Sequence, residues 1–436
     1  MRRTTPLTAM AVLGLALLAP TSVATAAGET CRGERATIVG SGGRDIVGTE
    51  GRDVVVTNRS SRVETLGGDD LVCITGPDKP RGTQALVDVD TGPGDDLVDG
   101  TAADDWAVSG RLGSGQDTFH GGDADDRIDA GELGDDYSHV DSERDILSGG
   151  GGRDLLTSGQ EGLPNGDQVR LGQGADHVTY LGTAIDPISI SGGPGADSML
   201  LSPAADAITV DNAAGRLTED GRPTLGWSGL EGFYVSATDE EGAAVTFVGT
   251  EGSDHLTVDS ASATITASFG GGRDSLTTRS LLLDGSVVDG GGGRDLLYVV
   301  DRERTLALDL RGELLTSTDT VSHRATVRRV EDAEVHARTV ALQGTDGPNE
   351  LAASACSAVI RGLGGADLLL RGSEEWSETG PPCRKERYTM SGGPGADELR
   401  GWRGNDTLVG GAGRDRADGD KGRDRCVAER TDGCER

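Results

Sequence analysis

Four nine-residue phrases follow one another without interruption at residues 392–427: GGPGADELR from Gly392, GWRGNDTLV from Gly401, GGAGRDRAD from Gly410 and GDKGRDRCV from Gly419. Each has glycine at its first and fourth positions and aspartate at its sixth. Glycine lets the backbone turn with positive φ because it has no Cβ to clash. Aspartate supplies a hard oxygen ligand, and an apolar eighth position faces a core. The phrase therefore predicts stacked turns that bind a metal ion.

Looser copies of the phrase run back through most of the chain. Of 21 turns in all, 18 have glycine two residues before the sixth-position residue, and 20 have an apolar residue two after it when Ala417 and Cys426 count as apolar. The sixth-position residues of these copies are Asp45, Asp53, Asp70, Asp96, Asp117, Asp126, Asp136, Asp145, Asp154, Asp167, Asp176, Asp197, Asp254, Asp274, Asp295, Asn349 and Asp367. A frame this long predicts one repeat architecture.

The spacing between successive acids predicts the fold class. It is nine residues throughout 397–424 and nine or ten throughout 117–154, which suits a half-coil made of a turn and a short strand. Elsewhere it widens to between 18 and 21, which suits a full coil with a metal-type turn on one edge only. We therefore expect an all-β parallel β-roll or β-solenoid built from nine-residue Gly/Asp half-coils, some of them degenerate or elongated.

Two long interruptions of the frame, at 197–254 and 295–349, resemble each other. Each contains an alternating strand, then an acidic motif (Leu230-Glu231 or Val330-Glu331), and returns through a G-T-x-G turn. They predict an internal duplication, with inserts that form ordinary solenoid coils without metal turns. The predicted divisions are a signal peptide at 1–26, a degenerate solenoid at 27–391 with the duplication at about 192–290 and 290–385, and well-preserved repeats with a disulfide-clipped tail at 392–436.

Composition limits the partners. The chain has 70 glycines, 3% aromatic residues and a formal net charge of −32. So many carboxylates in a compact stack repel one another, and divalent cations would compensate them. Nucleic acid and anionic membranes are excluded as partners by charge. Cationic polymers, or extracellular glycans bridged through calcium, stay open, and the sequence does not indicate an oligomeric state.

The first 26 residues predict export. Arg2 and Arg3 precede an apolar stretch from Ala9 to Leu18, and Ala24-Thr25-Ala26 has the small residues of a cleavage site. General secretory and twin-arginine routes both fit. No later apolar run reaches the ~18 residues of a membrane span. We expect a secreted, extracellular protein with no membrane span or anchor.

Six cysteines suit that compartment. They allow 15 pairings. Proximity in the sequence suggests Cys31–Cys73, Cys356–Cys383 and Cys426–Cys434. The alternative, a thiolate metal site, lacks Cys-x-x-Cys spacing and a nearby histidine.

Residues 392–427 resemble the hemolysin-type calcium-binding (RTX, repeats-in-toxin) family, whose phrase is G-G-x-G-x-D-x-U-x. The resemblance implies a parallel β-roll with Ca2+ between stacked turns, held by aspartate carboxylates and turn carbonyls. It also implies that Asp397 shares an ion with Asp415 and Asp406 with Asp424, and that Asp117–Asp136, Asp126–Asp145 and Asp136–Asp154 are pairs. The predicted metal-site residues are Asp397, Asp406, Asp415, Asp424, Asp117, Asp126, Asp136, Asp145, Asp154, Gly392, Gly401, Gly410 and Gly419.

No catalytic signature is present. The sequence has no H-E-x-x-H zinc motif, no G-x-S-x-G nucleophile turn and no phosphate-binding loop. The six histidines are scattered, and we expect them to face solvent. Trp106, Trp227, Trp376 and Trp402 form no recognisable cluster in the sequence. No catalytic residues and no enzyme activity are predicted.

The leading hypothesis is a secreted calcium-binding repeat protein with a structural or adhesive role, whose folding calcium stabilises. A second is a secreted β-solenoid enzyme that acts on extracellular polysaccharide. A third is a solenoid indifferent to calcium, whose aspartates only cap their turns through backbone hydrogen bonds.

Overall fold

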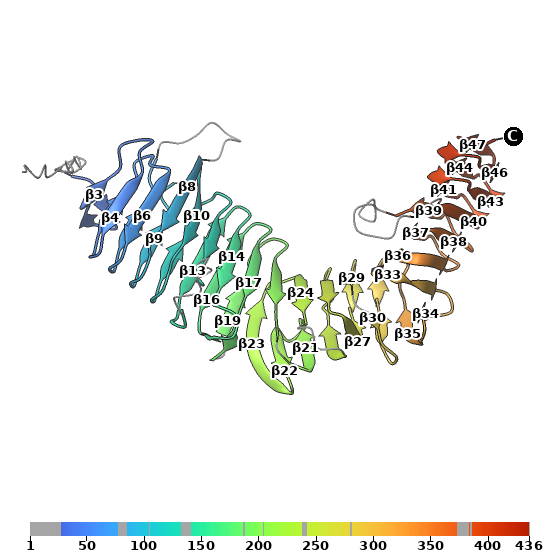
Figure 1. Ribbon diagram of the computed structural model, residues 1–436, viewed down its shortest axis with the longest axis horizontal. Helices are drawn as coiled ribbons and strands as arrows, with labels where there is room; N and C mark the ends of the chain where they lie inside the picture. The colour runs from blue at the N-terminus through green and yellow to red at the C-terminus, as the bar shows by residue number, and fades with distance from the viewer. Residues whose placement is uncertain are drawn as a thin grey trace, which may run out of the picture.

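The computed structural model describes residues 28–76, 85–103, 105–131, 141–185, 188–203, 205–237, 242–279, 281–372, 383 and 386–435. The regular elements in these ranges are β-strands, and they wind into one elongated solenoid (Figure 1). Within the same ranges, no helix has the length and hydrophobicity needed to cross a membrane. The predicted all-β, mostly parallel fold is confirmed. The predicted signal peptide at 1–26 lies outside the described residues.

Each coil contributes one strand to each of two faces. Face 1 is parallel throughout. Its strands, in spatial order, are β4 (Ile46–Thr49), β6 (Arg62–Leu66), β8 (Ala85–Asp90), β10 (Trp106–Arg111), β12 (Arg127–Asp129), β14 (Leu155–Ser158), β17 (His177–Tyr180), β20 (Ser198–Leu201), β24 (Gly232–Ser236), β26 (His255–Asp259), β29 (Ser275–Thr278), the first half of β33 (Leu296–Asp309), the first half of β36 (Asp332–Gln343), β37 (Glu350–Ser354), β39 (Leu368–Arg371), β41 (Glu398–Arg400), β44 (Arg416–Asp418) and β47 (Arg430–Asp432).

Face 2 is formed by the alternate strands and includes the second halves of β33 and β36. Its other strands are β3 (Ile38–Val39), β5 (Val54–Val56), β7 (Leu71–Cys73), β9 (Leu97–Asp99), β11 (Thr118–His120), β13 (Ile146–Gly151), β16 (Gln168–Gln173), β19 (Ile188–Ser191), β23 (Arg222–Ser228), β22 (Arg216–Glu219), β21 (Ala207–Asp211), β25 (Ala243–Val248), β27 (Ser262–Ser268), β30 (Leu281–Leu282), β31 (Val287–Asp289), β35 (Ser322–Arg328), β34 (Leu314–Thr318), β38 (Ser357–Arg361), β40 (Arg387–Gly395), β43 (Thr407–Gly413) and β46 (Arg425–Val427).

The two inserts differ from the prediction of ordinary parallel coils. In the first, β22 pairs antiparallel with both β21 and β23. In the second, β34 pairs antiparallel with both β33 and β35. Each insert thus adds a strand of reversed direction to face 2. The prediction was wrong because alternating hydrophobicity marks the inward side of a strand and not its direction.

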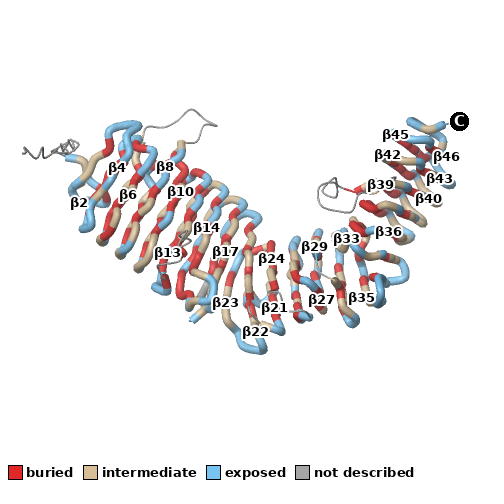
Figure 2. The backbone as a smooth tube through the Cα atoms, viewed as in Figure 1, coloured by how far each residue is buried: buried red, intermediate tan, exposed pale blue. Residues whose placement is uncertain are grey.

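A narrow apolar core lies between the faces. Successive residues of a strand point to opposite sides, so buried residues alternate with more exposed ones along most strands (Figure 2). The eighth-position residues Leu399, Leu408 and Ala417 are fully buried. In the middle of the chain the core also holds aromatic rings, and Phe247 and Phe269 lie 5.0 Å apart between ring centroids. Stacking of neighbouring coils is therefore what buries apolar surface.

Short strand pairs and disulfides finish the turns and ends. Two-residue parallel pairs join stacked turns: β15 (Pro164–Asn165) with β18 (Thr183–Ala184), β28 (Gly271–Gly272) with β32 (Gly292–Gly293), and β42 (Arg403–Gly404) with β45 (Lys421–Gly422). The three disulfides are Cys31–Cys73, Cys356–Cys383 and Cys426–Cys434, the pairs that proximity suggested.

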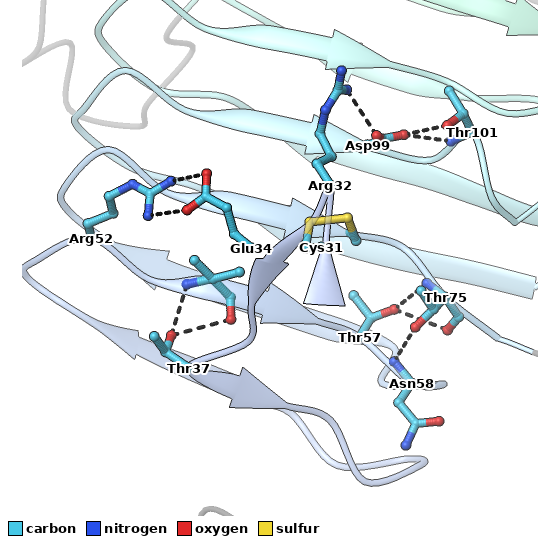
Figure 3. Close-up of a disulfide and its surroundings, with 12 residues drawn as sticks. Cys31, Arg32, Glu34, Thr37, Arg52, Thr57, Asn58, Thr75, Asp99 and Thr101 are labelled. Atoms are coloured by element: carbon cyan, nitrogen blue, oxygen red, sulfur yellow. Dashed lines mark hydrogen bonds and ion pairs between the residues drawn. A yellow bond between two sulfur atoms is a disulfide. The ribbon is translucent and has the colours of Figure 1, made fainter. Parts of the chain in front are cut away.

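At the N-terminal end, a small hairpin closes the stack. It consists of β1 (Thr30–Cys31) and β2 (Glu34–Arg35). Cys31 bonds it to β7, and Arg32 reaches further along the stack to donate a hydrogen bond to Asp99 at 2.9 Å (Figure 3). These links fasten the hairpin over the first coils.

The solenoid as a whole is bent into an arc (Figure 1). Its first coils and its C-terminus lie at opposite ends, and the antiparallel strands β22 and β34 lie at the outside of the bend (Figure 1). A long one-dimensional stack of this kind places the same turn positions in line from coil to coil.

Candidate metal centre

The sixth-position aspartates form hydrogen-bonded ladders along both edges of the stack. The backbone N–H of one aspartate donates to Oδ1 of the aspartate in the next coil. Asp397 donates in this way to Asp415 at 3.0 Å, and Asp406 to Asp424 at 2.8 Å. We call the turns that lead into face 1 the first edge and those that lead into face 2 the second edge. The first edge carries Asp126, Asp154, Asp176, Asp197, Asp254, Asp274, Asp295, Asn349, Asp367, Asp397 and Asp415, and the second carries Asp53, Asp70, Asp96, Asp117, Asp145, Asp167, Asp406 and Asp424.

The second carboxylate oxygen of most ladder aspartates is buried without a hydrogen bond. Leaving such an oxygen unsatisfied is costly, which indicates a ligand that the chain itself does not supply. In the described part of the chain, 14 aspartate Oδ2 atoms are in this state: those of Asp70, Asp96, Asp117, Asp126, Asp145, Asp154, Asp176, Asp197, Asp274, Asp295, Asp367, Asp397, Asp415 and Asp424.

These oxygens lie inside the turn, against its first glycine. A Cβ built on Gly392 would lie 2.2 Å from Asp397 Oδ2, and one on Gly410 would lie 2.6 Å from Asp415 Oδ2. The same holds for Gly401 and Gly419 against Asp406 and Asp424. The first glycine of the phrase is therefore needed for the space beside the carboxylate.

In most turns the conformation of the second position goes with the state of that oxygen; Asp126 and Asp145 are exceptions, since their Oδ2 is free although Gly122 and Asp141 lack a positive φ. Gly393 and Gly411 have φ of 118° and 121°, and the carboxylate in their turns keeps a free Oδ2. Where threonine stands there without positive φ, its N–H donates to the sixth-position side chain: Thr49 to Asp53 at 2.7 Å, Thr250 to Asp254 at 2.6 Å and Thr345 to Asn349 at 2.7 Å. We call the two kinds open turns and closed turns. In closed turns the side chain caps its own turn, as the third hypothesis expected.

Burial makes the ladder carboxylates hard to ionise. It raises the pKa of Asp96 and Asp126 to about 7, of Asp117 and Asp154 to about 8, and of Asp145 to about 10. Neighbouring carboxylates raise these values further, and the ladder hydrogen bonds partly oppose the shift. A divalent cation against Oδ2 would favour the ionised form.

The predicted site residues fall into three groups. Asp397, Asp415, Asp424, Asp117, Asp126, Asp145 and Asp154 have a free, buried Oδ2. Asp406 lies in a closed turn, where the N–H of Trp402 donates to its Oδ2 at 3.1 Å. Asp136 lies outside the described residues.

The register of the ladders corrects the three predicted pairings within 117–154, because Asp117 and Asp154 also have ladder partners other than the predicted Asp136. Asp397 stacks on Asp415 and Asp406 on Asp424, as the resemblance implied. Further back, Asp126 stacks on Asp154 at 2.9 Å, so its predicted partnership with Asp145 is wrong. Asp117 instead stacks on Asp145 at 2.8 Å. The prediction failed because these coils are 28 residues long and not 18, so counting every second acid moves to the opposite edge.

Four glutamates replace the aspartate where a coil lacks the Gly–x–Asp turn. Their Oε2 atoms accept the N–H of the preceding ladder aspartate: Glu231 from Asp197, Glu331 from Asp295, Glu429 from Asp415 and Glu435 from Asp424. Two of them bridge the inserts and two end the ladders at the C-terminus. Sequence reasoning noted the first two as acidic motifs without a role and missed the last two, which lie outside the phrase.

An ion at these turns would need backbone oxygens as well as carboxylates. Across the described ranges, His, Cys, Asp and Glu side chains form no group of three or more that could hold a metal ion. Calcium accepts six to eight oxygens, including backbone carbonyls. Stacked turns bring such carbonyls close: a Cβ on Gly413 would lie 1.5 Å from the carbonyl oxygen of Gly395. The donor set, hard oxygens with one buried carboxylate per open turn, fits Ca2+.

Comparison with known families identifies the RTX calcium-binding nonapeptide repeat at residues 112–135, 131–161 and 389–426. These segments contain the two stretches of nine-residue spacing and seven free Oδ2 atoms. The chain therefore carries RTX calcium-binding repeats, and it is a β-roll protein of the calcium-binding type. No curated protein matches its sequence.

Proposed function

We propose that this is a secreted repeat protein with a structural or adhesive, non-catalytic role, and that Ca2+ bound between its open turns stabilises the fold. The observation that carries the proposal is the set of 14 buried Oδ2 atoms without a hydrogen bond. Three disulfides support an oxidising, extracellular location.

The open turns of the RTX segments would hold the ions. Asp397 and Asp415 supply carboxylates on the first edge, and their turns supply carbonyls through the glycines that precede them. Calcium, when bound, would neutralise carboxylates that otherwise repel one another along the edge. Extracellular calcium modules bind at about 10⁻⁴–10⁻³ M. At ~1 mM calcium and a Kd of ~10⁻⁴ M, each ion would stabilise the folded state by about 1.4 kcal/mol.

Calorimetric titration of calcium into the chelated protein tests this. The double variant Asp397→Asn, Asp415→Asn keeps both Oδ1 acceptors but removes both charges. It should bind fewer ions than the wild type, and calcium should raise its melting temperature by less. Asp53→Asn is the matched control, because Asp53 lies in a closed turn and Asn349 shows that asparagine satisfies such a turn. Fewer than one ion per wild-type chain, or an unchanged ion count in the double variant, would reject the proposal.

The rival function, a polysaccharide-cleaving enzyme, is favoured by one pocket of about 380 Å³ on face 1 lined by Asp332, Glu334 and Glu350. Asp274 also lines the pocket, and three of these four carboxylates are already engaged: Asp332 with Arg294 at 2.6 Å, Glu334 with His336 at 2.8 Å, and Asp274 in the ladder, where its Oδ1 accepts the N–H of Asp254 at 2.7 Å. A glycosidase needs two available carboxylates. A screen for turnover of neutral and uronate glycans by the wild type and by Glu350→Gln distinguishes the two functions.

The histidines support the non-catalytic proposal. His255 Nδ1 lies 2.8 Å from Ser275 Oγ beside that pocket, which resembles part of a catalytic dyad. The same contact recurs at His177 and Ser198 at 2.9 Å, several coils away. The contact is therefore a stacking feature of the seventh position of the repeat. His336 is 1% exposed, which corrects the expectation that the histidines face solvent.

A further inference from the structure

A second pocket lies near the C-terminal end of the arc, where β39, β41 and β44 end and their turns begin (Figure 1). Its volume is about 400 Å³. Three successive coils contribute to it: the first with Leu370, Arg371 and Gly372, the second with Arg400, Gly401 and Trp402, and the third with Asp418 and Asp420. Leu370, Arg400 and Asp418 are direct neighbours in the strand register.

Two of the lining residues are the places where the closing repeats depart from their own phrase. The second position is glycine in the repeats that begin at Gly392 and Gly410, but tryptophan and aspartate in the other two. Those two, Trp402 and Asp420, lie on the same edge in adjacent coils and face the same pocket. Metal binding does not require either side chain, since the phrase itself has glycine there. Both departures therefore place a side chain that can contact a ligand, an indole ring or a carboxylate, at the same pocket.

Arg371 and Trp402 are already held in position. The Arg371 side chain is 10% exposed, and its guanidinium carbon lies 5.2 Å from the centre of the Trp402 ring. Its Nη1 donates to the Gly372 carbonyl at 3.1 Å, while its Nε makes no hydrogen bond and lies 3.5 Å from Glu386 Oε2. The contacts with Glu386 and with the Trp402 ring together fix the orientation of the Arg371 side chain at the wall of the pocket.

Acceptors complete the pocket. Asp418 and Asp420 line the pocket from the third coil, whereas Arg371 and Arg400 line it from the first and second. Neither aspartate forms an ion pair among the described residues. Arg400 is already engaged by Glu398 at 2.7 Å. The pocket therefore offers guanidinium donors, carboxylate acceptors and an indole ring together. A hydroxyl group both donates and accepts hydrogen bonds, and the C–H face of a sugar packs on an aromatic ring.

We propose that this pocket binds one unit of a neutral extracellular saccharide. Arg371 would donate to its hydroxyls, Asp418 and Asp420 would accept from them, and Trp402 would contact its apolar face. A uronate is disfavoured because its carboxylate would meet two aspartates. The proposal rests on the proposed function, since calcium-stabilised turns hold these side chains and an adhesive protein needs a site that binds an extracellular ligand.

Binding of soluble chito-, xylo-, cello- and malto-hexaoses, with oligogalacturonate as the charged probe, tests the site in calcium. The wild type should bind at least one neutral hexaose. Trp402→Ala removes the indole ring but keeps the closed turn at Asp406, and Asp420→Gly restores the glycine of the phrase in a turn that is already open. Both variants should therefore keep the calcium titration and the β-sheet spectrum while affinity falls at least about tenfold. Arg430→Ala, on the neighbouring strand β47 outside the pocket, should leave the affinity unchanged.

The outcomes separate this site from the calcium proposal. A wild type that binds calcium but no neutral hexaose, or that prefers oligogalacturonate, overturns the saccharide site alone. So does an affinity that Trp402→Ala leaves unchanged. Absence of calcium-linked stabilisation overturns the proposed function whatever the saccharides do.

Discussion

The fourth-position glycines of stacked turns lie so close together that no side chain fits between them. Gly413 has φ 155°, and a Cβ there would lie 1.5 Å from the carbonyl oxygen of Gly395. Gly395 meets Gly365 in the same way. The closed turns with threonine at the second position lack this contact: a Cβ on Gly347, also a fourth-position glycine, would meet only Thr345 Oγ1 at 3.7 Å. The fourth position of an open turn thus needs glycine for two reasons: the stacked turn leaves no room for a Cβ, and the backbone has a positive φ.

Gly413→Ala should therefore destabilise the protein by roughly 3 kcal/mol or more, since the backbone must move both turns apart. Gly347→Ala should change the free energy of unfolding by no more than about 0.5 kcal/mol, because the space and the backbone allow a methyl group. Urea unfolding at a fixed calcium concentration measures both. Similar losses in the two variants would contradict the distinction between open and closed turns.

Part of the site could be predicted from the residues, and part could not. The period places Leu399 in the core and Asp397 at the turn because both follow from one repeat length. In most turns, whether the acid is a free ligand or a cap goes with the φ of the residue four positions earlier, as Asp406 shows against Asp397. Glutamates such as Glu429 join the ladder from outside the phrase, so no spacing rule finds them.

At the scale of elements, the antiparallel strands of the inserts belong to the core and are not surface decoration. Leu217 on β22 and Leu315 on β34 are 4% and 2% exposed, and both join the main apolar cluster. The alternating strand predicted in each insert is present, as β21 and the second half of β33, but the reversed strands β22 and β34 were not predicted. A strand of either direction buries every second side chain, so only the turn geometry and the register distinguish them.

Leu315→Ala should cost about 2–5 kcal/mol, because it leaves a cavity in a core one side chain thick. Leu314→Ala is the matched control on the same strand, since Leu314 is 39% exposed and should cost about 0.5 kcal/mol or less. Thermal unfolding in calcium compares them. An equal effect of the two substitutions would mean that β34 does not pack on the core.

At the scale of the whole molecule, charge and fold oppose each other. The chain carries 73 Asp and Glu against 41 Lys and Arg, and among the residues that the structure describes 14 aspartates each bury an oxygen without a hydrogen bond. Without a cation, the ladders can be neutralised only by protons. Protons and calcium therefore compete for the same buried carboxylates, and stability depends on which is available.

The sign of the pH dependence follows from the raised pKa values. An unfolded aspartate titrates near pH ~3.9, whereas the pKa in the fold is about 7 for Asp96 and Asp126 and about 8 for Asp117 and Asp154. Between these pH values the folded chain binds more protons than the unfolded chain. The contribution of these groups to the free energy of unfolding is therefore largest below pH ~4, and it falls as the pH rises to about 8.

Calcium-free protein should thus melt at least about 5 °C lower at pH 8 than at pH 5, the reverse of ordinary acid denaturation. About 5 mM calcium should shrink that difference, because the ion stabilises the ionised carboxylates that protons no longer neutralise. Melting curves in chelator and in calcium across this range measure both effects. A melting temperature in chelator that rises from pH 5 to pH 8 would mean that the ladder aspartates are stabilised in their charged form without any cation, and the case for calcium in the open turns would lose its physical basis.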